Sequence, residues 1–373
     1  MRCVIHRIYW VLCIFIVIEL LSALYLLRTH GDNYMPLFSV SFSTYICFSA
    51  VKFTFVLFLL GNDCYRLIAG ICLRRILPRS RIITWLGVCL AFLSLNICMY
   101  GVTYGKYNYK VHSHAIYFDD LPPAFDGFKI VAISDIHAGS ILRTKPVQRG
   151  VNLINAQQGD LVVFLGDLVN SRSIEFAPLV NYFGQLRASH GKYAIMGNHD
   201  YGDYARWSDE TAREENVALL KKYFYEMEFR VLLNEHVTIE KDGQSIALIG
   251  VEDWGKGFSK RGNLSLAASG IDGDSFKILL THNPTHWEEQ VKNNPVNIQL
   301  SIAGHTHGMQ VGIEIPGVLK WSPAQYMYPH WGGLTKENNR YLYVSRGFGF
   351  LGLPGRIGIL PEITVIELKR KIR

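Results

Sequence analysis

The stretch FKIVAISDIH, residues 128–137, decides the fold. Its first seven residues form a short, almost unbroken apolar run, which is typical of a strand buried on both faces of a parallel sheet. Two polar residues, Asp135 and His137, follow at once. The same arrangement returns twice further on, where LVVFL (161–165) precedes Gly166-Asp167 and YAIM (193–196) precedes Gly197-Asn198-His199-Asp200. We therefore expect three parallel strands whose carboxyl ends carry polar side chains.

The segments between these strands complete the predicted fold class. Helical patterns at residues 146–158 and 174–186 alternate with the strands, as in an α/β protein. Another helix is expected at 211–229, and Gly105 to Phe118 alternates like a lead-in strand. A second group of shorter strands follows, at 230–233, 237–240, 245–250, 277–281, 298–303, 341–345 and 363–368. A two-sheet sandwich with helices on its outside is the simplest architecture.

Five polar clusters follow apolar strands. In parallel sheets, ligands bind beyond the carboxyl ends of the strands, so the clusters should meet at one edge. Carboxylate and imidazole side chains suit Mn, Fe, Zn, Co or Ni, and the absence of thiolates argues against a structural zinc site. Singly, each cluster is more often structural than functional. The five clusters are Asp135-Ile136-His137, Gly166-Asp167, Gly197-Asn198-His199-Asp200, His282 and Gly304-His305-Thr306-His307.

The order of these clusters resembles the calcineurin-like metallophosphoesterase superfamily, whose pattern is D-x-H, G-D, G-N-H-D/E, H and G-H-x-H. The resemblance covers about residues 125–370, and every element of the pattern is present. It implies a metallophosphoesterase sandwich and hydrolysis of a phosphoester or pyrophosphate bond. It also implies two divalent metal ions and attack on phosphorus by a hydroxide that bridges them.

The resemblance further assigns a role to each site residue. Asp135, His137 and His307 would bind one ion; Asn198, His282 and His305 would bind the other; and Asp167 would bridge both. His199 would protonate the leaving oxygen or contact the scissile phosphate, and Asp200 would orient His199. We interpret His286, one helical turn after His282, as an outer-shell or surface residue and not as a metal ligand.

Within the superfamily, several features are similar to a bacterial branch of membrane-bound or exported phosphohydrolases. They are the membrane spans, Thr281-His282-Asn283-Pro284, the Gly304–Gly308 segment, and Ser345-Arg346-Gly347 followed by Pro354-Gly355-Arg356. Some of its members are similar to pyrophosphatases that act on UDP-diacylglucosamine. A phosphorylated lipid or another envelope phosphoester is therefore the expected substrate. Two alternatives remain: a phosphodiesterase for soluble nucleotides or esters, and a metal-binding sensor without catalysis.

The glycine-rich C-terminal loop offers two further interpretations. Arg346 and Arg356 could clamp a substrate phosphate, or they could be surface residues of the loop. Apolar residues between Gly347 and Gly355, including Phe348 and Phe350, could form a lip that touches lipid, or they could pack in the core.

The first hundred residues predict a membrane module. Three apolar stretches, 8–27, 36–60 and 82–102, are long enough to cross a bilayer as helices. The first could be a signal peptide, but its length and the spans that follow favour an uncleaved anchor. Glu19 and Lys52 lie inside two of these stretches, and we hypothesise that they form an ion pair.

Loop charges predict the orientation of this module. The link between the second and third spans carries five arginines: Arg66, Arg74, Arg75, Arg79 and Arg81. Under the positive-inside rule this link is cytoplasmic, so three spans place the catalytic domain outside the cytoplasm. We expect a multi-pass protein of the inner membrane with a periplasmic catalytic domain. That placement weighs against a nucleotide-activated substrate, because such precursors are cytoplasmic.

Composition agrees with a membrane module followed by one catalytic domain. All seven cysteines precede residue 100, so the rest of the chain would tolerate an oxidising compartment. The net charge of +7 is concentrated around the membrane portion, so no nucleic-acid partner is expected. The predicted boundaries are 1–103 for the membrane module, 104–124 for a linker with the lead-in strand, and 125–373 for the metallophosphoesterase domain.

Overall fold

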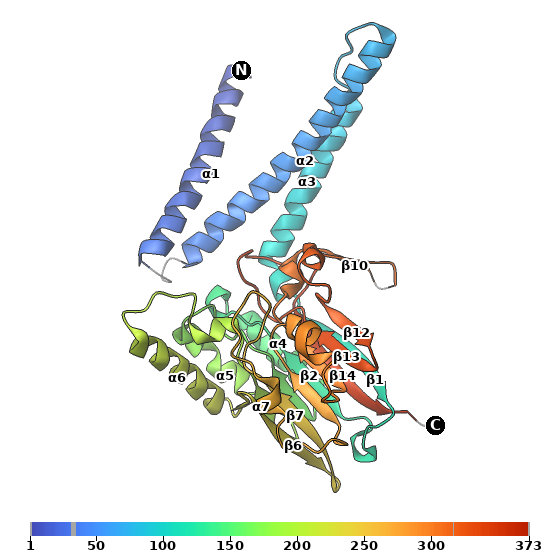
Figure 1. The fold of residues 1–373 in the computed structure, drawn as a ribbon. Helices are drawn as coiled ribbons and strands as arrows, with labels where there is room; N and C mark the ends of the chain where they lie inside the picture. The colour runs from blue at the N-terminus through green and yellow to red at the C-terminus, as the bar shows by residue number, and fades with distance from the viewer. Residues whose placement is uncertain (1, 31–34, 316, 372–373) are drawn as a thin grey trace. The chain divides into compact units, whose positions relative to one another are not determined.

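A computed structural model describes residues 2–30, 35–315 and 317–371 (Figure 1). The chain divides into two compact units. The first, called here the helical unit, contains Met1–Gly105 together with the short segment Leu353–Ile357. The second, called the catalytic unit because it holds the residues predicted to be catalytic, contains Lys106–Gly352 and Gly358–Arg373. The chain therefore passes between the units three times.

Three helices make up most of the helical unit: α1 (Arg2–His30), α2 (Met35–Leu73) and α3 (Arg81–Thr103). By length and composition, all three can cross a membrane. Helix α2 continues well beyond the predicted end of the second span at residue 60. The side chain of Asn62 braces the α2–α3 turn, because it donates to the Ser80 carbonyl and accepts from the Ser80 N–H, both at 3.0 Å.

The two charged residues inside the spans have other partners than the one we hypothesised. Glu19 accepts a hydrogen bond from Ser41 at 3.0 Å, whereas the Lys52 ammonium lies 3.8 Å from the Cys13 sulfur. Along α2, Ser41 and Lys52 are separated by about 16 Å of helical rise. The register of α1 against α2 thus keeps the charges apart, and no ion pair joins them among the described residues.

The catalytic unit is a sandwich of two six-stranded sheets. One sheet has the order β1-β14-β2-β3-β4-β5, and the other has the order β12-β13-β9-β8-β7-β6. Strands β2 to β5 run parallel, as do β7, β8, β9 and β13. The strands of the first sheet are β1 (Lys110–Phe118), β2 (Lys129–Ile133), β3 (Leu161–Phe164), β4 (Lys192–Ala194), β5 (Arg230–Val231) and β14 (Glu362–Arg370). Those of the second are β6 (Glu235–Lys241), β7 (Gln244–Gly250), β8 (Lys277–Leu280), β9 (Leu300–Ala303), β12 (Gly333–Glu337) and β13 (Arg340–Val344).

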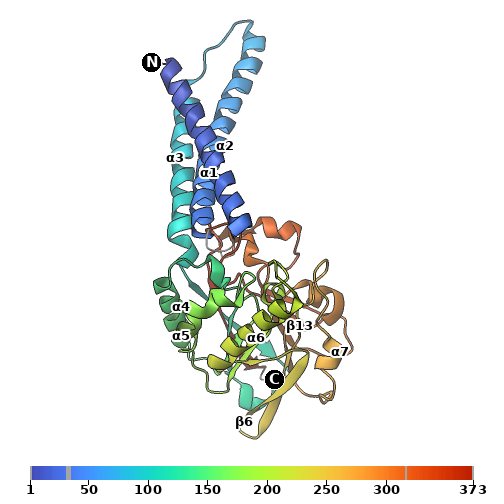
Figure 2. The same ribbon diagram turned by 90° about the vertical axis from the view of Figure 1, so that its left-hand side faces the viewer.

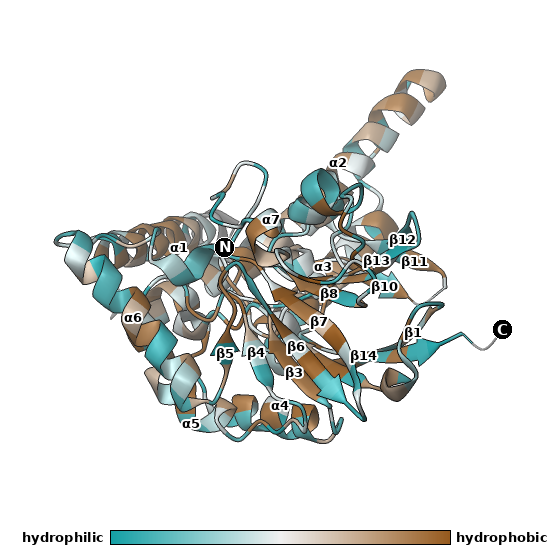
Figure 3. Ribbon diagram, turned by 60° about the horizontal axis from the view of Figure 1, so that its bottom comes forward, coloured by the Kyte–Doolittle hydropathy of each residue, from teal (hydrophilic) through white to brown (hydrophobic). Residues whose placement is uncertain are grey.

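Alternation along the central strands explains why they are apolar on both sides. In β2, Ile130 and Ala132 face the core between the two sheets, while Val131 and Ile133 face the helices outside. In β8, Ile278 and Leu280 enter the same inner core, and Leu279 faces outward. Figure 3 shows the same apolar (brown) colour along the central strands of the sandwich, for instance β7. A strand buried on both faces must be apolar throughout, which is the pattern that residues 128–134 predicted.

Helices cover the outer faces of the sandwich. Helices α4 (Lys145–Asn155) and α6 (Glu210–Glu226) lie outside the first sheet, as Figure 2 shows. The segment predicted as one helix at 174–186 forms a 3-10 helix, Ser173–Leu179, followed by one turn of α-helix, Val180–Phe183. Pro178 lies inside this segment and prevents a continuous α-helical hydrogen-bond ladder. The predicted two-sheet α/β sandwich, flanked by helices and preceded by apolar helices, is confirmed.

A two-stranded hairpin, β10 (Ile313–Ile315) and β11 (Leu319–Trp321), forms a small sheet of its own. It is tied to β14 through Arg346, which pairs with Glu362 at 2.6 Å and with Glu314 of β10. Arg346 is only 3% exposed and Glu362 is fully buried. Burial raises the pKa of the Glu362 carboxyl, but the Arg346 charge outweighs it and lowers that pKa to about 2.

We expect Glu362→Gln to destabilise the catalytic unit by about 3 kcal/mol, because it leaves a buried guanidinium short of one counter-ion. The matched variant Glu314→Gln removes a partly exposed partner and should cost about 1 kcal/mol or less. Urea unfolding in detergent, followed by near-UV circular dichroism, measures both. Because the folded-state pKa is depressed, the wild-type advantage should shrink as the pH falls from about 4.5 towards 2. Equal losses in the two variants would contradict this account.

Candidate metal centre

The polar clusters that follow the strands meet at one end of the sandwich. Asp135 and Asp167 lie just beyond β2 and β3, and Asn198 begins a short helical turn after β4. From the other sheet, His282 follows β8 and His305 follows β9. Parallel neighbours deliver their carboxyl ends to the same edge, so both sheets contribute ligating side chains to one place.

Five of these residues have a left-handed backbone, with φ between 49° and 74°. Such a conformation is uncommon for a residue other than glycine, and a cluster of such residues is typical of functional sites. It turns the chain sharply so that residues two apart, such as 305 and 307, both point into the site. The five are Asp135, His137, Asp167, His305 and His307.

Two glycines permit the close approach of these loops. A Cβ on Gly304 would overlap the Ser134 side chain, and one on Gly197 would overlap the Asp167 carboxylate. Any other residue at either position would push one ligand loop away from its neighbour.

The first group of potential metal ligands contains Asp135, His137 and His307, whose ligand atoms lie within 4.8 Å of one another. The His307 Nε2 atom is 3.4 Å from the Asp135 carboxylate. Both ring nitrogens of His137 are fully buried and have no hydrogen-bond partner. Because an unsatisfied buried nitrogen is costly, this ring fits a cation that would accept its lone pair.

The second group contains Asp167, His282 and His305. The His282 Nδ1 atom lies 2.7 Å from the Leu165 carbonyl, to which it donates, and its Nε2 atom faces the Asp167 carboxylate at 3.1 Å. Asn198 completes the group, because its side-chain oxygen is 3.1 Å from the His305 Nδ1 atom.

Asp167 connects the two groups. Its Oδ2 atom lies 3.1 Å from the His282 Nε2 atom and 3.5 Å from the His137 Nε2 atom. Its other oxygen accepts the His199 backbone N–H at 2.9 Å. One carboxylate therefore faces imidazoles of both groups, which is the position that a bridging ligand needs.

Burial sets the protonation of the histidines. It lowers the pKa of His137 and of His305 to about 3, which leaves both rings neutral and able to bind a metal. It also lowers the pKa of His282, but the Asp167 charge outweighs it and raises that pKa to about 10. The Asp167 carboxylate thus stabilises positive charge at His282, and the same electrostatic environment would favour a divalent cation there.

The His199 ring lies beside the two ligand groups. It stacks on Tyr204, with ring centroids 4.3 Å apart, and meets the edge of His137 at 4.9 Å. Its Nδ1 atom is 2.6 Å from the Asn170 carbonyl, so Nδ1 carries the proton and Nε2 lies on the opposite side of the ring. Neither Tyr204 nor Asn170 could be identified from the sequence, since neither belongs to a polar cluster that follows a strand.

Asp200 forms no hydrogen bond with the His199 ring in the part of the chain that the structure describes, in contrast to the predicted orienting role. Its two oxygens accept backbone N–H groups of Asp167 and Leu168 at 2.8 Å and of Gly197 at 2.9 Å. It therefore shapes the backbone of two ligand loops, and the Asn170 carbonyl takes the place that we expected for Asp200 beside His199.

The two arginines predicted either to clamp a phosphate or to lie on the surface are both buried inside the protein. Arg346 is buried between Glu314 and Glu362. Arg356 is fully buried, and its backbone N–H donates to the Gly101 carbonyl within the helical unit.

Of the two interpretations of the apolar lip, core packing holds for Phe348 and Phe350, which are at most 2% exposed. His286 is also buried, and its Nδ1 atom lies 2.9 Å from the Thr281 hydroxyl.

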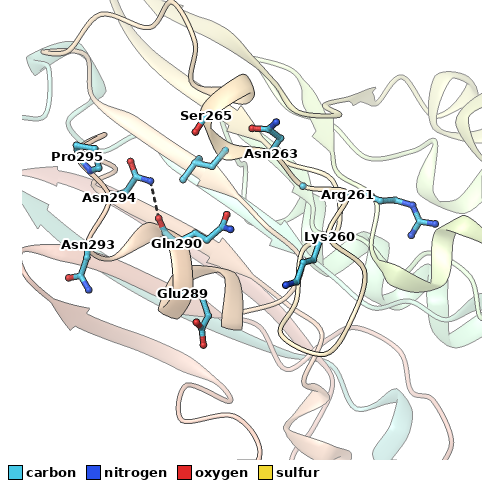
Figure 4. Close-up of a pocket in the computed structure, with 11 residues that line it drawn as sticks. Lys260, Arg261, Asn263, Ser265, Glu289, Gln290, Asn293, Asn294 and Pro295 are labelled. Carbon is cyan, nitrogen blue, oxygen red and sulfur yellow. Dashed lines mark hydrogen bonds between the residues drawn. The ribbon is translucent and has the colours of Figure 1, made fainter.

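A pocket of about 600 Å³ lies elsewhere on the catalytic unit, between residues 260–265 and 289–295 (Figure 4). None of the predicted site residues lines it. Two of its charged side chains are ion-paired: Arg261 with Asp203 at 3.0 Å and Glu289 with Lys256 at 2.8 Å. We assign no ligand to it.

The fold and the clustered ligands together define a metal-binding α/β sandwich protein with a helical membrane module. Comparison with known proteins extends this conclusion. Residues 128–309 match the family described as calcineurin-like phosphoesterase, and residues 2–106 match a probable calcineurin-like phosphoesterase transmembrane domain.

Relatives are found in bacteria and in vertebrates. The chain is 32% identical over 260 residues to the uncharacterized metallophosphoesterase YkuE of Bacillus subtilis, which covers 69% of this chain and 84% of YkuE. It is 28% identical to the transmembrane protein with metallophosphoesterase domain of Danio rerio, and 31% identical to that of Bos taurus. These matches cover 76% and 67% of this chain, which spans 62% and 54% of the two vertebrate proteins.

The chain therefore belongs to the calcineurin-like phosphoesterase family, which hydrolyses phosphoester bonds with the help of divalent metals. It is a membrane protein with a transmembrane domain. The resemblance stated from the order of the motifs is confirmed.

We expect Asp200→Asn to lower metal affinity about ten- to a hundredfold although Asp200 is not a proposed ligand, because an amide cannot accept all the backbone N–H bonds that shape the ligand loops. Titration with Mn²⁺, followed by calorimetry, measures the change. Asp242→Asn, in an exposed turn, is the matched control and should leave the affinity unchanged. Unaltered affinity in Asp200→Asn would show that the ligand loops hold their shape without this carboxylate.

Proposed function

We propose that this chain is a binuclear phosphohydrolase that cleaves a phosphoester or pyrophosphate bond of a lipid or another envelope substrate. The observation that carries the proposal is the position of the Asp167 carboxylate, 3.1 Å from His282 and 3.5 Å from His137. Two ligand groups that share one carboxylate suit two cations only a few ångströms apart.

The ligand assignment follows from these groups. Asp135, His137 and His307 would hold one ion, Asn198, His282 and His305 would hold the other, and Asp167 would bridge them. When bound, two such cations neutralise charge on the phosphoryl oxygens and acidify a water molecule. Their identity among Mn, Fe, Zn, Co and Ni depends on supply as well as on these mixed oxygen and nitrogen ligands.

His199 is the proposed general acid. The Asn170 carbonyl holds the proton on Nδ1, so a protonated ring can release only its Nε2 proton to the leaving oxygen. The backbone N–H of His199 donates a hydrogen bond to the Asp167 carboxylate, which fixes the position of the acid relative to the proposed bridging ligand. Stacking on Tyr204 restricts rotation of the ring. Asp200 acts as a positioning residue through the backbone of both loops.

The membrane module supports a lipid or envelope substrate, because it keeps the enzyme beside the bilayer. The arginines of the α2–α3 turn support a cytoplasmic turn and hence an extracytoplasmic catalytic unit. A soluble nucleotide or ester is the alternative substrate for the same chemistry. A metal-binding sensor is the alternative without chemistry, and the presence of both ligand groups and His199 disfavours it.

We expect the wild-type chain to retain two divalent ions after dialysis, measured by inductively coupled plasma mass spectrometry. His137→Ala should retain about one ion, because it removes a ligand from one group and leaves the other group intact. Asp167→Asn should retain less than one, because it weakens both. His236→Ala, a histidine outside the site, is the matched control. A wild-type chain that retains a single ion would overturn the binuclear assignment.

The activity test is a panel of an aryl phosphomonoester, an aryl phosphodiester, a phospholipid and a UDP-sugar lipid, supplied with Mn²⁺ or Zn²⁺. We expect turnover of lipid members, and His199→Ala should lower kcat by about 10²- to 10⁴-fold while metal content is retained. His190→Ala, outside the ligand groups, should match the wild type. Turnover restricted to soluble esters would favour the alternative substrate, and no turnover with both ions bound would favour the sensor.

A further inference from the structure

The β10–β11 hairpin has the reverse of the usual polarity for a small antiparallel sheet. Such sheets normally turn their apolar face to the core and their polar face to solvent. Here the register pairs Ile313 with Trp321 and Ile315 with Leu319, so all four apolar side chains share one face. The remaining pair, Glu314 and Lys320, occupies the other face.

The polar face is the one attached to the protein. Glu314 forms an ion pair with the buried Arg346 guanidinium. Lys320 donates to the Gly332 carbonyl, and its ammonium lies 4.9 Å from the centre of the Trp331 ring. These contacts hold the hairpin in one orientation, so its apolar face cannot turn inward.

The apolar face is consequently exposed. Ile313 and Ile315 are 48% and 50% exposed, Leu319 is 45% exposed, and Val318 beside the turn is 79% exposed. Tyr326 and Met327, in the segment that follows the hairpin, are 78% and 61% exposed. A set of exposed apolar side chains along one surface segment of a folded protein indicates a surface that another apolar phase covers. We call this set, with Trp321, the hairpin patch.

Residues next to the hairpin patch in the sequence are hydrogen-bonded to the loop that carries His305 and His307. The Ser322 hydroxyl, one residue after β11, donates to the Gly308 carbonyl, and Thr306 donates to the Trp331 carbonyl at 2.6 Å. The Tyr328 hydroxyl lies 3.0 Å from the Nε2 atom of the proposed ligand His305. The patch and the second ligand group thus belong to one continuous packed segment.

The chain itself identifies what can cover the patch. Only Tyr104 and Gly105 separate the last residue of α3, a candidate membrane span, from the first residue of the catalytic unit. Three Cα–Cα steps of extended chain span at most about 11 Å, so the catalytic unit begins within that distance of the end of a candidate membrane span. Tryptophan and tyrosine beside aliphatic residues are the side chains that favour the interface between lipid and water.

We propose that the hairpin patch inserts into the interfacial region of the bilayer and presents the metal centre to phosphate groups at the lipid surface. This inference rests on the proposed function, for which it supplies the way a lipid phosphoester reaches the site. Apolar side chains on a surface element enter the boundary between headgroups and acyl chains, and the polar face stays on the protein. The substrate class that fits is a phosphoester whose phosphate lies at the headgroup level.

The first experiment measures the position of the hairpin patch without catalysis. The full chain is reconstituted in liposomes of phosphatidylethanolamine and phosphatidylglycerol, with an environment-sensitive fluorescent amino acid in place of Val318. Lipids brominated in the upper acyl chain should quench this fluorophore. The matched control carries the fluorophore in place of Ile174, which is also largely exposed and lies outside the patch, and should show no quenching.

Either of two other results would overturn the proposal. A Val318 fluorophore that emits as in water would show that the patch is not covered. Apolar emission without quenching by brominated lipid would show that protein covers it, from the helical unit or from a second copy.

The second experiment connects the patch to turnover. Val318→Asp/Leu319→Asp should lower hydrolysis of a phospholipid in the same liposomes about tenfold or more, because two apolar side chains no longer enter the interface. Turnover of a soluble aryl phosphoester should be unchanged, which also verifies folding, and Ile174→Asp should change neither rate. Equal loss on both substrates would overturn the docking role. If the wild type hydrolyses nothing, the proposed function fails, and the quenching experiment still decides the position of the patch.

Discussion

The buried carboxylate of Asp200 is the constraint on which the metal centre depends. It accepts backbone N–H groups from Asp167 and Leu168 after β3 and from Gly197 after β4, so it binds the ends of two neighbouring strands together. Burial raises its pKa to about 7, which shows how strongly a charge is disfavoured there. Three short N–H bonds compensate for that burial only when both loops have their observed conformation. The position of Asp167 between the ligand groups follows from this.

The stability of the two-sheet sandwich offsets the free-energy cost of burying such a polar cluster. Carboxylates and imidazoles buried without partners would destabilise a small domain. Here both sheets are apolar on each face, with strands such as β2 and β8 buried in two cores. The left-handed residues at the strand ends are held by pairing that does not depend on them, for instance between β2, β3 and β4. Strain and desolvation are therefore concentrated at the edge where a cation would relieve them.

Sequence reasoning succeeded where the information is local. A buried parallel strand must be apolar throughout, and a polar cluster must follow it if a site exists, so residues 128–137 indicate both the sheet and its functional edge. The order of five such clusters then indicated the family. Pairings across the chain could not be predicted in this way. Nothing near Arg346 reveals that Glu314 lies against it, and the register of α1 on α2, which separates Glu19 from Lys52, depends on packing between the helices.

The hairpin patch shows why composition alone could not decide which apolar segment is exposed. Residues 347–355 are rich in glycine and aromatic side chains. Phe348 nevertheless stacks on Tyr109 in the core, with ring centroids 4.3 Å apart. The β10–β11 hairpin is less apolar, since Glu314 and Lys320 interrupt it, yet those two residues are what turns its apolar face outward. Exposure of an apolar face is thus set by where the polar residues bind. Because Ser322 and Trp331 tie the same segment to the loop of His305 and His307, a force that positions the hairpin also positions one edge of the metal centre.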